Sequence, residues 1–264
     1  MGKLKIIFSF FLKRALRDKK TRFFIFLSMI PVLIFAVMAV LNLFNPGFLR
    51  GIKYLLGEMS VQFYLLILVQ LLALFYGTSV ISEEVDDKTL VYLTARPVSK
   101  ATILLGKFSS YLLVPFMLLM IGLLGSFIFY FILFRFDITL LYYVRFVLEL
   151  AGIGALHCLA YGSLSLLLGT LFKRPLIVGI IFIYGWENFA YYFPGSTRYL
   201  TLNFYLRPLL PSFNYARNSR FFGFRIEPMS PGEPVLIILL LFTLFLILSI
   251  CLFRQKEYLI ADTD

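Results

Sequence analysis

Six long apolar runs limit what this chain can fold into more than any other feature of its sequence. They lie near residues 23–44, 60–82, 111–134, 146–171, 176–193 and 235–253. Each has about 18 residues or more, enough for a helix to cross the roughly 30 Å hydrocarbon core of a bilayer. The runs are continuously apolar, unlike the alternating strands of a barrel. We therefore predict an all-α membrane protein with six transmembrane helices, in which residues 1–264 form a single transmembrane domain.

The composition and the placement of charge agree with this class. Hydrophobic residues make up 61% of the chain and charged residues 15%, far from the values of a soluble globular domain. Most of the 25 Lys and Arg residues precede the first run or lie in the loops that share its side of the membrane. Since cytoplasmic segments carry such an excess of bases, we expect both termini in the cytoplasm. This placement of bases explains the net charge of +11 by the orientation of the chain in the membrane. We therefore expect no nucleic-acid partner.

Residues 1–22 are predicted to be a cytoplasmic segment built around one helix. Residues 3–17 carry an apolar stripe at helical spacing with bases around it, and the stripe consists of Leu4, Ile7, Phe8, Phe11 and Ala15. Such an amphipathic helix is typical of segments that lie on the inner leaflet. A basic flank without a special role would show the same charge pattern, so both interpretations stay open.

A polar segment over residues 77–100 separates the second and third runs. Ser82 is placed to cap a helix, and the acids that follow complement the positive end of its dipole. Pro97 ends that helix near Arg96, and Ser99 is placed to cap the next one. Because bundle helices are commonly joined by only about 2–8 residues, the cytoplasmic loop 83–108 predicts either a partner surface or a solvated juxtamembrane helix.

The fourth run carries a stripe of small side chains. Their spacing alternates between four and three residues, and they are Ala151, Ala155, Cys158, Gly162, Ser165 and Gly169. Small residues at this spacing allow two helices to approach closely. The contact that they predict lies either within the chain or across a dimer.

Residues 194–234 form a long segment on the extracytoplasmic side, rich in proline and aromatic residues. Its amphiphilic, proline-broken pattern suits an element packed against protein. The segment is expected to be either external or re-entrant.

Catalytic chemistry is not evident in the sequence. The segment "ATILLGKFSS" has Ala101 and Phe108 where a phosphate-binding loop needs glycine and a hydroxyl. The segment "EEVDDK" resembles the Glu-Glu-x-x-x-Arg motif of prenyl-protein-processing membrane proteases only poorly, because Lys88 replaces the arginine and the chain has one histidine. We therefore expect no catalytic residue, no metal site and no cofactor bound by this chain.

Three ionisable residues lie in or beside predicted spans: Glu149 and His157 on the fourth and Glu187 on the fifth. Ionisable groups inside a membrane are costly, so they commonly mark a substrate path. A paired structural carboxylate is the competing interpretation for Glu149 and Glu187, because both lie toward the outer side.

The polar segment and its surroundings resemble the permease subunits of the type-two exporter class of ATP-binding-cassette transporters. In that class an acidic pair after the second span is followed by Thr or Ser, a hydrophobic helix, Arg/Ser-Pro and Gly-Lys. The matching positions here are Glu83, Glu84, Thr89, Tyr92, Leu93, Arg96, Pro97, Gly106 and Lys107. The six-span plan, the N-terminal helix and the long segment before the last span agree with the same class.

The resemblance implies a coupling helix at residues 82–97 that docks on a separate ATPase. The docking residues that it implies are Glu83, Glu84, Asp86, Asp87, Lys88, Thr89, Tyr92, Arg96 and Pro97. It further implies a second permease copy or paralogue, two ATP-binding-cassette ATPase subunits that bind ATP and Mg²⁺, and a location among the lipids of a prokaryotic cytoplasmic membrane. A non-transporting membrane anchor or assembly factor is the alternative function, followed by an intramembrane enzyme.

Overall fold

The structure is a computed structural model, and it describes residues 2–44, 61–86, 99–133, 140–192, 196–210 and 232–255. All secondary structure within these ranges is helical. In chain order the helices are α1 Gly2–Arg17, α2 Lys19–Ser28, α3 Ile30–Phe44, η1 Phe63–Leu68, α5 Val69–Asp86, α7 Lys100–Leu133, α8 Leu140–Leu171, α9 Pro175–Ile180, η2 Ile181–Glu187, α10 Asn188–Tyr192, η3 Ser196–Leu200, α11 Leu202–Leu206, η4 Arg207–Leu209 and α12 Gly232–Gln255. Helices η1 and η2 are π-helical turns within longer helices, whereas η3 and η4 are 3₁₀ turns.

Five helices among the described residues are long and apolar enough to cross a membrane. They are Lys19–Met38, Phe63–Glu83, Lys100–Phe129, Val144–Leu171 and Gly232–Gln255. Each overlaps one of the runs predicted from the sequence, with ends that differ by up to about eleven residues. The remaining run, at 176–193, forms the shorter apolar helix Pro175–Tyr191. The helical class is therefore confirmed, and five of the six runs form helices of spanning length.

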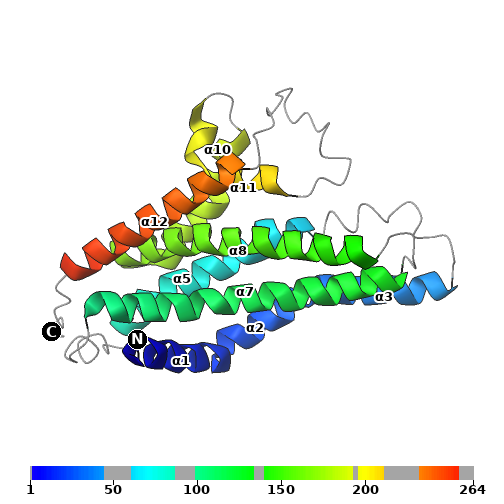
Figure 1. Cartoon of the computed structure of the whole chain (residues 1–264), viewed down its shortest axis with the longest axis horizontal. Coiled ribbons are helices and arrows are strands. Elements are labelled where there is room, and N and C mark those ends of the chain that lie inside the picture. Colours follow the sequence, from blue (N-terminus) through cyan, green and yellow to red (C-terminus); the bar gives the residue numbers. More distant parts are fainter. Residues whose placement is uncertain are drawn as a thin grey trace.

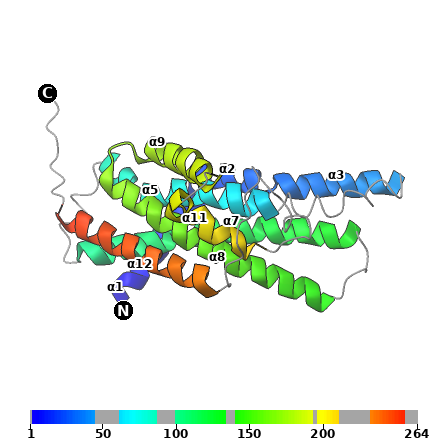
Figure 2. The same ribbon diagram turned by 90° about the horizontal axis from the view of Figure 1, so that it is seen from above.

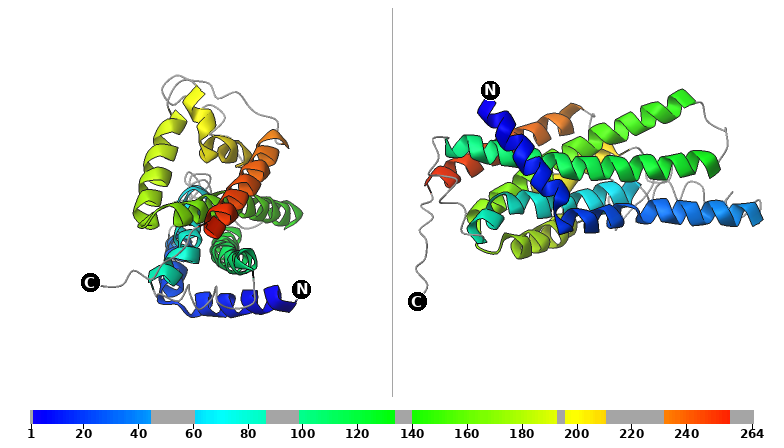
Figure 3. Two further views of the ribbon diagram at one scale, coloured as in Figure 1. Left: turned by 90° about the vertical axis from the view of Figure 1, so that its left-hand side faces the viewer. Right: turned by 90° about the horizontal axis from the view of Figure 1, so that it is seen from below.

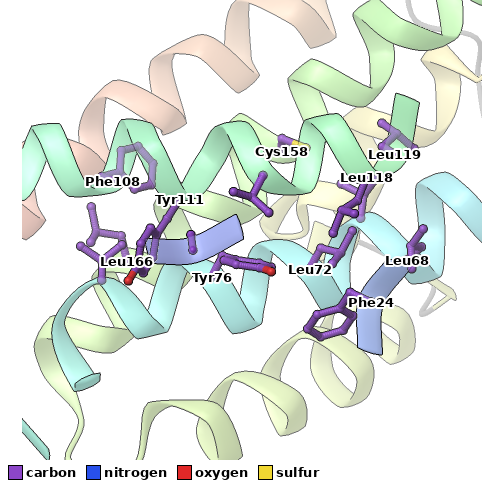
Figure 4. Close-up of a cluster of buried hydrophobic side chains, with 14 of the residues drawn as sticks. Phe24, Leu68, Leu72, Tyr76, Phe108, Tyr111, Leu118, Leu119, Cys158 and Leu166 are labelled. Atoms are coloured by element: carbon purple, nitrogen blue, oxygen red, sulfur yellow. The ribbon is translucent and has the colours of Figure 1, made fainter. Parts of the chain in front are cut away.

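Helix α5 forms the centre of the bundle. It packs against both α7 and α8. In the most apolar part of the span Phe63–Glu83, 72% of the residues are buried, compared with 11% in the corresponding part of α12. Helices α5, α7 and α8 run along the long axis of the molecule (Figures 1 and 2). Helices α1 to α3 lie on one side of them and α10 to α12 on the other (Figure 1). The core between them is apolar and aromatic, as Figure 4 shows for Leu68 of η1 and for Leu72 and Tyr76 of α5, which lie against Tyr111 and Leu118 of α7.

The small-residue stripe of α8 lies against α5. A Cβ atom added to Gly77 would be 2.6 Å from Ser165 Cβ and 2.9 Å from the Gly162 carbonyl oxygen. A Cβ on Gly169 would be 3.1 Å from the Thr78 carbonyl oxygen. At these positions the close contact predicted from the stripe is therefore made within the chain.

The helix α1 crosses one end of the bundle instead of running along it. Figure 3 shows α7 nearly end-on in its left view while α1 is seen from the side. Asp18 alone separates α1 from α2, and its extended backbone (φ −65°, ψ 146°) lets the chain turn there. Its carboxylate accepts the Lys20 backbone N–H at 3.2 Å and so caps α2. We call residues 15–21 the elbow and the end of the bundle that carries them the elbow end.

The coupling helix predicted to begin at Ser82 does not begin there in the structure. Ser82 does not cap a new helix, because α5 continues through it to Asp86, and the Ser82 hydroxyl donates to the Thr78 carbonyl oxygen at 3.1 Å. The helix of the second span therefore continues into the polar residues without a break. The prediction for Ser99 is confirmed: its Oγ accepts the Thr102 backbone N–H at 3.2 Å, at the start of α7.

The contact at Gly77 predicts that a single methyl group destabilises the bundle. Gly77→Ala should lower the thermal unfolding midpoint, because one of the two helices must move and such overpacking commonly costs about 1–3 kcal/mol. The same change at Gly152, where no atom lies within 4 Å of the added Cβ, should leave the midpoint unchanged or raise it, since alanine favours helices. Unfolding in detergent, followed by tryptophan fluorescence, would compare the two variants. Equal midpoints would contradict the close packing of α5 on α8.

Candidate functional site

The polar end of α5 meets α2 and α7 at a partly buried carboxylate. Lys20 Nζ donates to Glu83 Oε1 and also to Ser79 Oγ, the latter at 3.1 Å. The Tyr111 hydroxyl donates to Glu83 Oε2 at 2.9 Å. Both oxygens of Glu83 are therefore bound within the chain, one by α2 and the other by α7.

A second lysine lies beside this carboxylate. Lys107 Nζ is 5.1 Å from the centroid of the Phe11 ring and 5.2 Å from that of Tyr111, the geometry of cation–π contacts. The residue is 2% exposed, and its positive charge acts on Glu83 together with that of Lys20. We call Lys20, Ser79, Glu83, Lys107 and Tyr111 the elbow cluster.

The elbow is fixed to the bundle by further hydrogen bonds around the cluster. Thr21 Oγ1 lies 2.5 Å from both the Ala15 carbonyl oxygen and the Tyr76 hydroxyl. The Ser110 hydroxyl lies 2.9 Å from the Phe8 carbonyl oxygen, which connects α7 to α1. The elbow cluster thus joins four helices, α1, α2, α5 and α7, at the base of the polar loop.

The structure places only part of the predicted docking segment. Glu83 belongs to the elbow cluster, and Glu84 and Asp86 follow it at the end of α5. The rest of the set lies outside the described residues: Asp87, Lys88, Thr89, Tyr92, Arg96 and Pro97. Sequence patterns did not identify Lys20 and Tyr111 as the partners of Glu83, since the three residues are far apart in the chain and no local spacing relates them.

The three ionisable residues of the predicted spans do not form one site. Glu149 is exposed and pairs with Arg145 one turn away, Nε to Oε1 at 2.9 Å. His157 is buried, and its Nδ1 lies 2.9 Å from the Ile153 carbonyl oxygen on the same helix. Glu187 is buried on a different helix, η2. No group of three His, Cys, Asp or Glu side chains suited to a metal ion occurs in the part of the chain that the structure describes.

Glu187 connects the long segment after α10 to the spans. Its Oε1 accepts the Leu202 backbone N–H at 3.0 Å, and its Oε2 accepts that of Asn203 at 3.1 Å. These are the first N–H groups of α11, which have no partner within their own helix. The Tyr161 hydroxyl of α8 lies 3.3 Å from the same Oε2. The carboxylate therefore holds α11 in place, and this part of the predicted outer segment is folded against the bundle.

The network around Glu187 reaches the central helix through Gln70. Gln70 Nε2 donates to the Tyr161 hydroxyl at 3.0 Å and to Asn203 Oδ1 at 3.1 Å. Gln70 Oε1 and His157 Nε2 are buried and lack a hydrogen-bond partner among the described residues. We call Gln70, Tyr161, Glu187 and Asn203 the outer junction, because they join α5, α8, η2 and α11.

The outer junction predicts a structural role for Glu187. Glu187→Gln should lower the free energy of unfolding by about 1–3 kcal/mol, since the two backbone N–H groups bind different oxygens of Glu187 and the amide NH2 would leave one of them without an acceptor. Glu149→Gln is the matched control and should cost less than about 1 kcal/mol, because its ion pair is exposed. Thermal unfolding and hydrogen exchange of the peptides covering 196–210 would measure both effects. A Glu187→Gln variant of normal stability but altered transport would instead assign the residue to the substrate path.

Comparison with known proteins identifies the class of this chain. The family model described as "ABC-2 family transporter protein" matches residues 11–188, about two thirds of the chain, which include the elbow cluster and the polar loop. No curated protein matches the sequence. The match agrees with the multi-pass arrangement of apolar helices and confirms the resemblance noted in the sequence. The chain therefore belongs to the ABC-2 family of transporter proteins, as the membrane component of a transporter.

Proposed function

We propose that this permease subunit forms the translocation path of an ATP-driven exporter together with a second copy or a paralogue. Two separate ATP-binding-cassette ATPases dock on residues 82–97 and bind ATP and Mg²⁺. The observation that carries this proposal is the family match over residues 11–188, which contains the whole docking segment. In this arrangement Pro175–Tyr191 serves as one of six spans, both termini are cytoplasmic and the membrane is that of a prokaryotic cell.

The elbow cluster supplies a route from the docking segment to the spans. The loop begins where α5 ends, and Glu83 at that end is bound by Lys20 of α2 and Tyr111 of α7. A displacement of the loop by the ATPases therefore acts on three helices at once. ATP favours one of two conformations only through its different free energy of interaction with each, and a rigid connection lets that difference reach the spans.

The acids of the docking segment divide into two roles. Both oxygens of Glu83 are already bound within the chain, so its role is to hold the loop to the bundle. The acids that follow, Glu84, Asp86 and Asp87, are assigned to basic groups on the ATPase. Complementary charge at a rim mainly sets orientation and the rate of association.

The docking role predicts the effect of reversing charge beyond Glu83. Asp86→Lys with Asp87→Lys should release the ATPase from the chain purified from its native host, because like charges then face each other across the interface. Glu149→Lys with Glu233→Lys is the control, since both residues are exposed, lie outside the loop and change the net charge equally. Mass spectrometry of the co-purified proteins would measure the loss. Undiminished ATPase in the loop variant would contradict docking at these acids, and no ATPase with the unaltered chain would favour the non-transporting anchor.

The elbow cluster predicts a rescue by charge exchange. Lys20→Glu and Glu83→Lys should each lower the unfolding midpoint and the ATP hydrolysis of the assembled complex, because each places like charges together. The double variant should recover part of both losses, with a coupling energy on the order of 1 kcal/mol. The ATPase should stay bound in all three variants, which separates this effect from that of the docking acids. A double variant as impaired as the sum of the single ones would show that the pair carries no coupling.

A further inference from the structure

The side of α1 that faces away from α7 presents apolar and basic side chains together. Ile6, Phe10, Lys13 and Arg17 follow one another at intervals of four, three and four residues and therefore lie on one side of the helix. All four are exposed, Ile6 at 71% and Phe10 at 62%. The opposite stripe is buried against α7, with Phe11 at 2%. Helix α1 thus has one side committed to the bundle and a second, mixed side that no described residue covers.

The start of α2, which follows α1 after one residue, also carries exposed basic and aromatic side chains, and these follow a definite order. Lys19 and Arg22 are exposed at the elbow end of the helix. Phe23 and Phe26 are exposed at 61% and 65% and lie further into the apolar span. A base at the membrane boundary followed by aromatic residues deeper in the span is the order expected where a helix passes from lipid headgroups into acyl chains.

The position of α1 puts its mixed side at the depth where α2 passes from the lipid headgroups into the acyl chains. Asp18 is the only residue between α1 and α2, and α2 begins the apolar span Lys19–Met38. Because α1 crosses the elbow end of the bundle (Figure 3), it lies where the span enters the bilayer. A crosswise helix with bases and large apolar residues on one side has the geometry of an interfacial helix.

The charge of this surface selects among lipids. The sequence of α1 contains no acidic residue. The neighbouring acid, Asp18, is engaged by Lys20, through the backbone N–H at 3.2 Å and through Nζ at 3.7 Å. Clusters of Lys and Arg beside the end of a span attract anionic headgroups. We propose that Lys13, Arg17, Lys19 and Arg22 bind the phosphate groups of anionic phospholipids, while Ile6, Phe10, Phe23 and Phe26 contact their acyl chains.

This lipid surface is continuous with the elbow cluster, although the proposal does not depend on ATP-driven transport. Lys20 follows Lys19 in the chain and holds Glu83. Phe11 follows Phe10 in the chain, and its ring makes the cation–π contact with Lys107. Anionic lipid thus binds one side of the elbow while the elbow cluster binds the other.

The test places a single fluorescent reporter in the surface. The chain has one tryptophan, Trp186. The double change Trp186→Phe and Phe10→Trp therefore leaves a single reporter, on the side of α1 that faces away from α7. The full chain is reconstituted in phosphatidylcholine vesicles that contain a minor fraction of brominated phosphatidylglycerol or, in equal amount, brominated phosphatidylcholine. Bromine quenches tryptophan on contact, so the ratio of the two quenching efficiencies measures the local preference for anionic lipid.

We expect phosphatidylglycerol to be preferred several-fold at residue 10. Adding Lys13→Gln and Arg17→Gln should remove most of that preference and bring the ratio of the two quenching efficiencies close to one, because two of the bases that attract anionic headgroups are lost. Lys173→Gln with Arg174→Gln is the matched control, since these bases are exposed in the turn after α8, and the preference should not change. Equal quenching by both lipids, or equal loss in the two pairs of variants, would overturn the proposal. No quenching by either lipid would also overturn it, because protein would then cover this side of α1.

Discussion

Because the hydrocarbon core holds no water, a polar group within the spans requires a partner inside the protein if its burial is not to cost several kcal/mol. This requirement accounts for the main polar contacts of the structure. The Tyr64 hydroxyl lies within 3.0 Å of the Ser28 and Gly122 carbonyl oxygens and 2.8 Å from Ser126 Oγ. Gln70 reaches Tyr161 and Asn203, and Glu83 reaches Lys20 and Tyr111. Each set connects helices that are distant in the sequence, so satisfying the polar groups also fixes the packing of the bundle.

These contacts are distributed along one continuous helix, η1 followed by α5. Tyr64 binds the first-span and third-span helices near its start, Gln70 joins the outer junction, and Glu83 joins the elbow cluster at its end. Between the last two, Gly77 brings the helix into close contact with α8. A helix held at both ends and packed tightly between them moves as a unit. In the proposed exporter, α5 therefore transmits a displacement of the loop toward the outer junction.

The class of the fold followed from the sequence because apolar length is a local property, and five of the predicted spans have helices of spanning length. Ser99 was recognised as a cap for the same reason, since its partner is three residues away. Ser82 was misassigned because a local capping pattern cannot show whether the preceding helix has already ended. The partners of Glu83 and Glu187 depend on residues brought together only by packing, and for these the sequence offered residue types without an arrangement. The small-residue stripe predicted a contact, but only the fold could show that α5 provides it.

The elbow combines two kinds of interaction that respond to different conditions. Its inner side is held by buried contacts, with Lys107 2% exposed beside Phe11 and Tyr111, and buried charges are little affected by salt. The side of the elbow that faces away from the bundle carries the exposed bases of the proposed lipid surface. Their attraction to anionic lipid weakens as salt or neutral lipid increases. Loss of the lipid contact would thus free α1 from the membrane surface without breaking the elbow cluster. The composition of the membrane would then set how firmly α2 and α7 are anchored when the loop moves. The connection between the loop and the spans through the elbow cluster would stay intact.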